Sequence, residues 1–289
     1  MAKPSVQRIS GPGGWVNGDA VFVGPNPPDE ASITYYQKRR HIFGDLKMEV
    51  LDSEGKVQST VPTSKRRGLS RATWSMRLKP PQVPSAAIAA GGAFMGPRIL
   101  PGNYTVKMTK DQQVYNSKLQ VSADPRAKHS ADDRRTQFDL SMKLYHLLGD
   151  MTYAVERINA VRLGLEERIS KLPREDPLAK RLRTAAGEID GFRKRIVATK
   201  EGGMITGEER LREFLAELYG NVVGYEGRPS QTQVERTQAI ERELADVVKD
   251  FETWVAKELP GVNTAITQKQ LAPVTPPTRE DWEKRSGRK

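Results

Sequence analysis

The sequence predicts an α+β protein in which an N-terminal antiparallel Ig/FnIII-like β-sandwich is followed by a C-terminal antiparallel α-helical bundle. Up to Asp124-Pro125, short runs alternate apolar with polar residues and end at Gly, Pro or Asn, as strands and turns do. Beyond Pro125, apolar residues recur every three or four positions, as in helices that pack together. The expected domains are the sandwich at 1–125 and the bundle at 126–262, with an extended or disordered tail at 263–289.

Seven short segments in the first part have the alternation or composition of strands. No helical pattern separates them, so neighbouring strands are expected to pair in an antiparallel manner. The predicted strands lie in residues 19–28, 32–37, 46–52, 57–61 and 69–78, and two more form a hairpin within 98–126. Gly55 lies in the turn that joins 46–52 to 57–61, where it can take the positive φ of a tight hairpin. The stretch 86–95, rich in Ala and Gly, is expected to be a flexible loop.

Four segments of the second part carry both a start signal and an apolar stripe. A long helix is expected to begin at Ser130, whose hydroxyl can accept from free amides, and to end by Pro173. Asp176-Pro177 places an N-cap residue before a proline at the first helical position. Capping boxes predict the other two starts, at Thr206–Glu209 and Ser230–Gln233.

Composition excludes several classes of protein. The 289 residues include no cysteine, so disulfides, thiolate nucleophiles and cysteine-bound zinc are excluded. No run approaches the roughly 20 apolar residues of a transmembrane helix, and MAKPSVQRIS lacks the apolar segment of a signal peptide. The three histidines, His41, His129 and His146, lack the spacing of metal ligands, and no triad or paired-carboxylate pattern is visible. The sequence therefore predicts no catalytic residue, no metal and no cofactor.

Positive charge gathers in the first part of the chain. The net charge is +11, and residues 1–125 hold 17 Lys or Arg against 9 Asp or Glu, which leaves +8 there. Such a domain can attract nucleic acid, anionic lipid or an acidic protein. The plainer interpretation is an ordinary solvated surface, because soluble domains often carry such charge without a polyanionic ligand.

Two basic loops are the candidates for contact with a polyanion or a protein partner. The motif QKRRH contains Lys38, Arg39 and Arg40, and SKRRG contains Lys65, Arg66 and Arg67. Each motif joins predicted strands, so the two could lie on one edge of the sandwich. Three nearby aromatic residues could stack on bases or sugars, namely Tyr35, Tyr36 and Trp74. No nucleic-acid-binding fold signature accompanies them, so nucleic acid is not the expected partner.

Several segments, taken in order, resemble a known family. They are FVGPNPPDEASITYYQ, LKMEVLDSEGKVQSTV, GLSRATWSMRL, LPGNYTVKM and KLQVSADPR, with LAELYGNVVGYEGRPSQTQ and ELPGVNTAI further along. These segments resemble the C-terminal region of bacterial proteins with sortilin-like or glycosyl-hydrolase-type BNR/WD40-like propellers. In that family an Ig-like domain, similar to the flagellar hook-capping one, and a helical bundle follow the propeller. The resemblance covers about residues 13–273.

The resemblance implies a non-catalytic accessory or interaction module that docks on a β-propeller domain or subunit, or on another envelope protein. It also implies a periplasmic or extracellular location. The family's label as hydrolase belongs to the propeller, whose Asp-box repeat S-x-D-x-G-x-x-W does not occur in this sequence. Two alternatives stay open: a polyanion-binding module that uses loops 37–41 and 64–68, and an accessory subunit of a glycan or peptide hydrolase.

Overall fold

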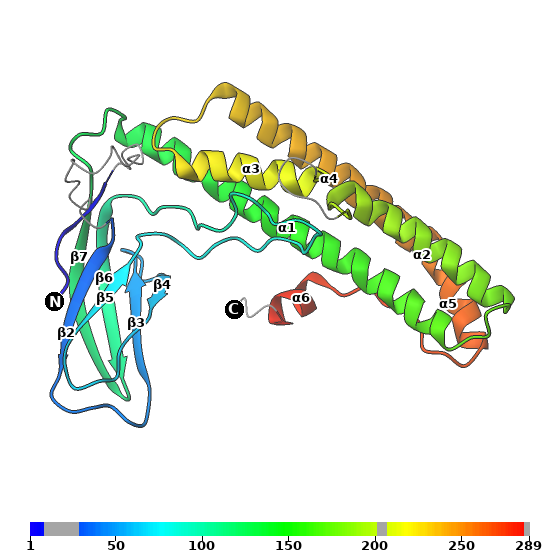
Figure 1. The fold of residues 1–289 in the computed structure, drawn as a ribbon, viewed down its shortest axis with the longest axis horizontal. Coiled ribbons are helices and arrows are strands. Elements are labelled where there is room, and N and C mark those ends of the chain that lie inside the picture. The colour runs from blue at the N-terminus through cyan, green and yellow to red at the C-terminus, as the bar shows by residue number, and fades with distance from the viewer. Residues whose placement is uncertain (9–28, 201–206, 286–289) are drawn as a thin grey trace, which may run out of the picture. The chain divides into compact units, whose positions relative to one another are not determined.

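A computed structural model describes residues 1–8, 29–200 and 207–285, and the protein is α+β (Figure 1). The chain forms two compact units. Unit 1 comprises residues 1–79, 95–139 and 225–228, and unit 2 comprises residues 80–94, 140–224 and 229–289. This division differs from the predicted boundary at residue 125, because 80–94 groups with the helices and 126–139 with the strands. The strand predicted at 19–28 lies outside the described residues.

The described residues of unit 1 form seven strands in two sheets. They are β1 (Ser5–Gln7), β2 (Ala31–Gln37), β3 (Leu46–Leu51), β4 (Val57–Val61), β5 (Gly68–Trp74), β6 (Gly102–Lys110) and β7 (Gln113–Ala123). One sheet has the order β1-β7-β6-β3-β4, and β2 pairs with β5 in the other. Strand β1 runs parallel to β7, so the larger sheet is mixed and the wholly antiparallel arrangement predicted from the sequence is wrong. Because Ser-Val-Gln holds a single apolar side chain, alternation could not reveal this strand.

The two sheets of unit 1 contribute to one apolar core. Ile33 and Trp74 come from the two-stranded sheet, and Met48, Val106 and Leu119 come from the five-stranded sheet. All five are nearly or fully buried. Trp74 packs edge-on against the ring of Tyr104 at 5.8 Å between centroids, so the two sheets are linked through aromatic contact as well as through aliphatic packing.

Within the described ranges, six helices follow the strands. They are α1 (Ala131–Ser170), α2 (Pro177–Ile196), α3 (Leu211–Gly224), α4 (Gln231–Lys257), α5 (Leu259–Gln268) and α6 (Arg279–Arg285). Three predicted starts are confirmed. The Asp133 amide donates to Ser130 Oγ at 3.1 Å, the Leu178 amide donates to Asp176 Oδ1 at 2.8 Å, and Ser230 forms a reciprocal capping box with Gln233.

The start predicted for the third helix is wrong. Thr206 lies outside the described residues, and α3 begins at Leu211, where the Glu213 carboxylate accepts from the Arg210 amide at 3.0 Å. Glu208, the third residue of the predicted box, accepts from the Thr199 amide at 2.9 Å. This backbone hydrogen bond, with the nearby Arg210 guanidinium, lowers the pKa of Glu208 to about 2. The carboxylate that a capping box requires here is that of Glu209, and residues 207–210 are not helical, so the box does not start α3.

The segment 80–94, which includes all but the last residue of the stretch 86–95 predicted as a flexible loop, is packed against the helices of unit 2. Arg212, buried on α3, donates to the carbonyl oxygens of Pro84 at 2.7 Å and Ile88 at 3.0 Å. Ala93 is buried in the same apolar core as the helices. Gly92 lies so close to Gly220 of α3 that a Cβ atom on either residue would come within 3 Å of the other's backbone. Because neither glycine has a side chain, segment 80–94 can lie directly against α3.

The tail predicted at 263–289 to be extended or disordered is folded as far as residue 285. Residues 259–268 form α5 and 279–285 form α6, whose Trp282 is 2% exposed and donates from Nε1 to Glu156 at 2.6 Å. Between these helices, the Val274 amide donates to the Asn263 side chain at 2.7 Å. The sequence did not indicate this packing, because isolated apolar residues among prolines and charges show no period.

Replacing Gly220 by Ala tests the close approach of segment 80–94 to α3. We expect Gly220→Ala to lower the free energy of unfolding by roughly 1–2 kcal/mol, since overpacking outweighs the gain in helix propensity. Gly191→Ala is the matched control, because that glycine lies on α2 with no atom within 4 Å of the added Cβ. The control should be neutral or stabilising by up to about 1 kcal/mol in urea denaturation. Equal effects of the two substitutions would contradict the packing.

Replacing Trp282 tests whether the tail is anchored. Trp282→Ala removes a buried ring and its hydrogen bond to Glu156. We therefore expect the free energy that holds the tail against the helices to fall by roughly 3 kcal/mol or more. Limited trypsin digestion should then cleave near Arg279 much faster than in the wild-type chain. Glu280→Ala, at an exposed position of the same helix, should leave the cleavage rate unchanged.

Candidate functional site

Strand pairing brings the two basic loops of unit 1 together. Residues 38–45 join β2 to β3, and residues 62–67 join β4 to β5. Gln37, at the end of β2, lies opposite Gly68 at the start of β5, and Met48 of β3 lies opposite Val61 of β4. Both loops therefore pass between the two sheets at the same end of the strands, on one edge as the sequence suggested.

Hydrogen bonds hold the two loops side by side. The His41 amide donates to the Lys65 carbonyl at 2.9 Å, and the buried Gln37 side chain donates to the Ser64 carbonyl at 2.7 Å. The Tyr35 hydroxyl accepts from the Ser64 amide at 2.6 Å and lies 3.0 Å from the Ser64 carbonyl, to which it donates. These bonds fix the backbone of both loops, so the charges they carry have defined positions.

The β6–β7 turn supports the first of these loops. The Asp111 amide donates to the Asp45 carbonyl at 3.0 Å, and the Asp111 carboxylate lies 3.6 Å from His41 Nε2. Gly44 has a φ of +86°, and a Cβ there would collide with the Asp111 carboxylate. Only glycine therefore fits at this point of the loop, where the chain turns back towards β3.

The six cations predicted as contact residues are exposed and gather on these loops. We call them the basic loop face: Lys38, Arg39, Arg40, Lys65, Arg66 and Arg67. The ammonium of Lys65 donates to the Gly44 carbonyl at 2.7 Å. None of the six forms an ion pair with another residue in the part of the chain that the structure describes. Asp45 is the acidic residue within the two loops.

An exposed apolar pair lies directly beside these cations, and the sequence analysis missed it. Ile42 is 66% exposed and Phe43 is 86% exposed, both in the loop that carries Arg39 and Arg40. We call Ile42 and Phe43 the apolar tip. The signal was present in the sequence as Ile-Phe directly after KRRH and before Gly-Asp, but an apolar pair in a loop gives no period by which to assign exposure.

The three aromatic residues predicted to stack on a ligand near the basic loops differ in their exposure. Trp74 is 3% exposed and its Nε1 donates to the Arg77 carbonyl at 3.3 Å, so its predicted role in stacking is wrong. The Tyr35 hydroxyl is engaged by Ser64. Tyr36 is 66% exposed and lies opposite the exposed Leu69 on the outer surface of the β2–β5 sheet.

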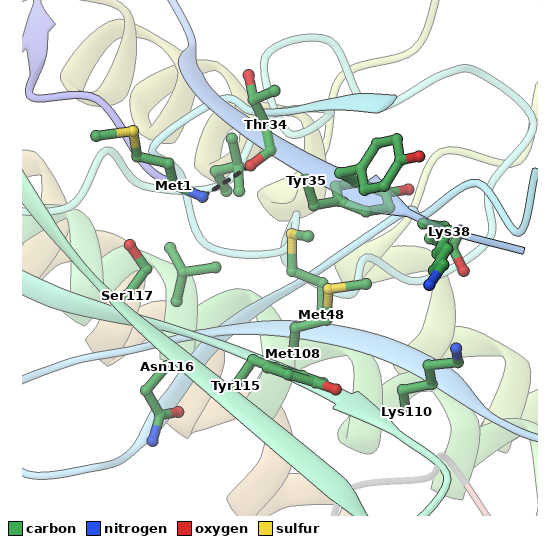
Figure 2. Close-up of a pocket in the computed structure, with 14 residues that line it drawn as sticks. Met1, Thr34, Tyr35, Lys38, Met48, Met108, Lys110, Tyr115, Asn116 and Ser117 are labelled. Carbon is green, nitrogen blue, oxygen red and sulfur yellow. Dashed lines mark hydrogen bonds between the residues drawn. The ribbon is translucent and has the colours of Figure 1, made fainter. Parts of the chain in front are cut away.

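A cleft of about 450 Å³ opens between β2 and the β6–β7 hairpin within unit 1 (Figure 2). Ile33, Met48 and Val106 line it with buried apolar groups. Figure 2 shows Met48 and Met108 near its middle, Met1 and Ser117 at one end, and Lys38 and Lys110 at the other. The Met1 nitrogen donates to the Thr34 carbonyl at 2.7 Å beside that first end.

The volume and lining of this cleft suit an apolar group that carries an anion. Small-ligand pockets span roughly 300–1,000 Å³, and flexible methionine side chains adapt to irregular apolar shapes. Lys38 belongs both to the cleft and to the basic loop face, so positive charge is continuous between them. The cleft contains neither a nucleophile beside a base nor converging carboxylates among its lining residues.

A second group of cations in unit 1 is buried and structural. Arg98, 8% exposed, pairs with the carboxylates of Asp29 and Glu226. Arg134 donates to the Ile99 carbonyl at 3.1 Å and to Gln137 Oε1 at 2.7 Å. Burial lowers the pKa of Arg98, and it lowers that of Arg134 to about 10, which leaves the Arg134 guanidinium charged at neutral pH. Through these bonds and ion pairs the two arginines hold segments of unit 1 together.

Among the described residues, no group of three or more His, Asp or Glu side chains is placed to hold a metal ion. His129 lies 3.9 Å from Glu226, and His41 faces the Asp45 carbonyl at 3.2 Å. None of the helices in the described ranges has the length and hydropathy to cross a bilayer.

Comparisons with protein-family models, with curated proteins and with solved structures gave no match to this chain. The resemblance to the C-terminal region of propeller proteins therefore stays a prediction. What carries a functional argument is the geometry of unit 1: the basic loop face, the apolar tip and the cleft.

Removing the Tyr35 hydroxyl tests the bonds that hold the loops together. Tyr35→Phe leaves the Ser64 amide without its acceptor, so we expect a loss of about 1 kcal/mol and faster hydrogen exchange at Ser64. Tyr36→Phe is the matched control, because no hydrogen bond from the Tyr36 hydroxyl occurs among the described residues. Unchanged exchange at Ser64 in Tyr35→Phe would show that the loops are held by other contacts.

Proposed function

We propose that this protein is a non-catalytic interaction module that binds an anionic partner through the basic loop face. The observation that carries the proposal is the juxtaposition of the two Lys-Arg loops. Their six cations come from separate segments, yet the His41–Lys65 and Gln37–Ser64 hydrogen bonds place them together. The two loops carry six exposed cations, none of them in an ion pair among the described residues, against the one carboxylate of Asp45, and a purely structural loop does not need such an excess of positive charge.

The electrostatics of such a face favour a partner with many negative charges. Exposed cations a few ångströms apart repel one another, and an anionic surface relieves this repulsion while it releases counterions. The attraction is screened over about 8 Å at physiological salt, so close contact is required. Arginine adds specificity for phosphate and carboxylate groups, because its planar fork donates two parallel hydrogen bonds. Four of the six cations are arginines.

The proposal includes a finer description of the fold: an Ig/FnIII-like sandwich in unit 1 and an antiparallel helical bundle in unit 2. The shared apolar core of the two sheets supports the first part. The common core to which α1, α2, α3, α4 and α5 contribute supports the second. In such an arrangement the loops at the end of a sandwich are the usual place for binding residues.

Docking on a β-propeller or another envelope protein stays a prediction that rests on the family resemblance alone. An acidic surface on such a partner would be one form of the anionic partner proposed above. A propeller protein that co-purifies with this chain, but not with a variant whose basic loop face carries reversed charge, would identify the anionic partner as a propeller.

Charge reversal on the basic loop face tests the proposal. We expect Arg39→Glu combined with Arg66→Glu to weaken binding to heparin and to polyphosphate at least about tenfold, because one cation on each loop becomes repulsive. The slope of log affinity against log salt should become shallower by about 1 for each cation lost. Heparin and polyphosphate serve as general anionic probes in a titration followed by fluorescence anisotropy.

Lys118→Glu combined with Lys128→Glu is the matched control. Both lysines are exposed in unit 1 and lie outside the two loops, so the net charge changes equally while the basic loop face stays intact. If the control weakens probe binding as much as the loop variant does, the affinity reflects net charge alone and the proposed face has no special role.

A further inference from the structure

The apolar tip is the feature that the proposed function does not explain. Phe43 at 86% exposure and Ile42 at 66% lie next to each other in a loop whose backbone is fixed at both ends. His41 is bonded to Lys65 on one side of the pair, and Asp45 is bonded to Asp111 on the other. The fixed loop thus exposes two apolar side chains to water. Contact of apolar surface with water is unfavourable, and folded proteins usually bury such groups.

Cations lie beside the apolar tip on one side, and the exposed Asp45 follows it in the same loop. Arg39 and Arg40 precede it in the same loop, and Lys65 is tied to that loop at His41 and at Gly44. A partner that satisfies both features must offer an anionic layer with an apolar layer directly behind it. The interface of a bilayer that contains anionic lipid has this order, with phosphates at the surface and acyl chains some 5–10 Å deeper.

Other anionic partners fit the tip less well. Nucleic acid could stack a base on Phe43, but Ile42 has no aromatic face and would stay hydrated. An acidic protein would need an apolar pocket to receive a protruding tip. A bilayer accepts both side chains without such a pocket, and long arginine and lysine side chains can reach phosphates while their stems lie along apolar surface.

We infer that unit 1 docks on an anionic lipid bilayer by inserting Ile42 and Phe43 at the boundary between head groups and acyl chains, with the basic loop face on lipid phosphates. This inference rests on the proposed function and specifies its partner. Neither feature is sufficient by itself. Two apolar side chains bind a neutral bilayer weakly, and stable attachment of a peripheral protein takes two signals, one apolar and one electrostatic.

Vesicle sedimentation with the full chain tests the inference. We expect binding to vesicles of phosphatidylcholine mixed with phosphatidylglycerol, little binding to phosphatidylcholine alone, and release by added salt. Phe43→Ser should weaken binding to the mixed vesicles about tenfold, because the inserted ring supplies the larger apolar area. Phe94→Ser is the matched control: Phe94 is 70% exposed in segment 80–94, without a cationic neighbour in sequence, and its loss should have no effect.

Fluorescence supplies a direct readout of insertion. The tryptophan introduced by Phe43→Trp should shift to shorter wavelength on mixed vesicles and be quenched by lipids with brominated acyl chains. The tryptophan introduced by Phe94→Trp should show neither change. Both positions are highly exposed, so neither substitution removes core packing, and thermal unfolding should be unaltered in each variant.

The outcomes separate this inference from the proposed function. Weaker vesicle binding by Phe43→Ser, with heparin binding unchanged and quenching by brominated chains, supports insertion. Vesicle binding that depends on Arg39 and Arg66 but not on Phe43, or no vesicle binding while heparin still binds, overturns the inference and leaves the anionic-partner proposal standing. Heparin binding insensitive to the loop charges overturns the proposal itself.

Discussion

The antiparallel pairing of β2 with β5 and of β3 with β4 determines where the charge of this protein is concentrated. Each pair places a strand end beside a strand start, so the two connections between the sheets must leave from the same end. Two runs of three cations, at 38–40 and 65–67, are thereby neighbours in space although they are far apart along the chain. The His41–Lys65 and Tyr35–Ser64 hydrogen bonds then fix a geometry that the pairing has already made possible.

Local signals in the sequence predicted the elements whose causes are themselves local. Ser130, Asp176 and Ser230 start helices because a side-chain oxygen can satisfy amides two or three residues away, whatever the rest of the chain does. Alternation found β2, β3, β4, β5 and the β6–β7 hairpin, since a half-buried sheet imposes a period of two. The Lys-Arg loops could also be predicted, because charged residues between strands are exposed whatever the tertiary structure.

Features that depend on distant partners could not be predicted. The third helix begins at Leu211 and not at the Thr206–Glu209 box. Segment 80–94 packs on this helix because Arg212 donates to its carbonyl groups and Gly220 leaves room for its backbone. Trp282 is buried against Glu156, at a separation of 126 residues. The exposure of Phe43 and the cleft beneath Tyr35 likewise follow from how strands from separate parts of the chain meet.

The interleaving of the two units along the chain has a consequence for their separability. Cutting at residue 125 would leave Arg98 without Glu226 and the carbonyl of Ile99 without Arg134, while segment 80–94 would be parted from Arg212. Neither unit can be excised by one cleavage with its interior intact. Because the two units interleave along the chain, recombination that moves one of them alone would disrupt both. The strand-rich and helical units are therefore expected to be inherited together.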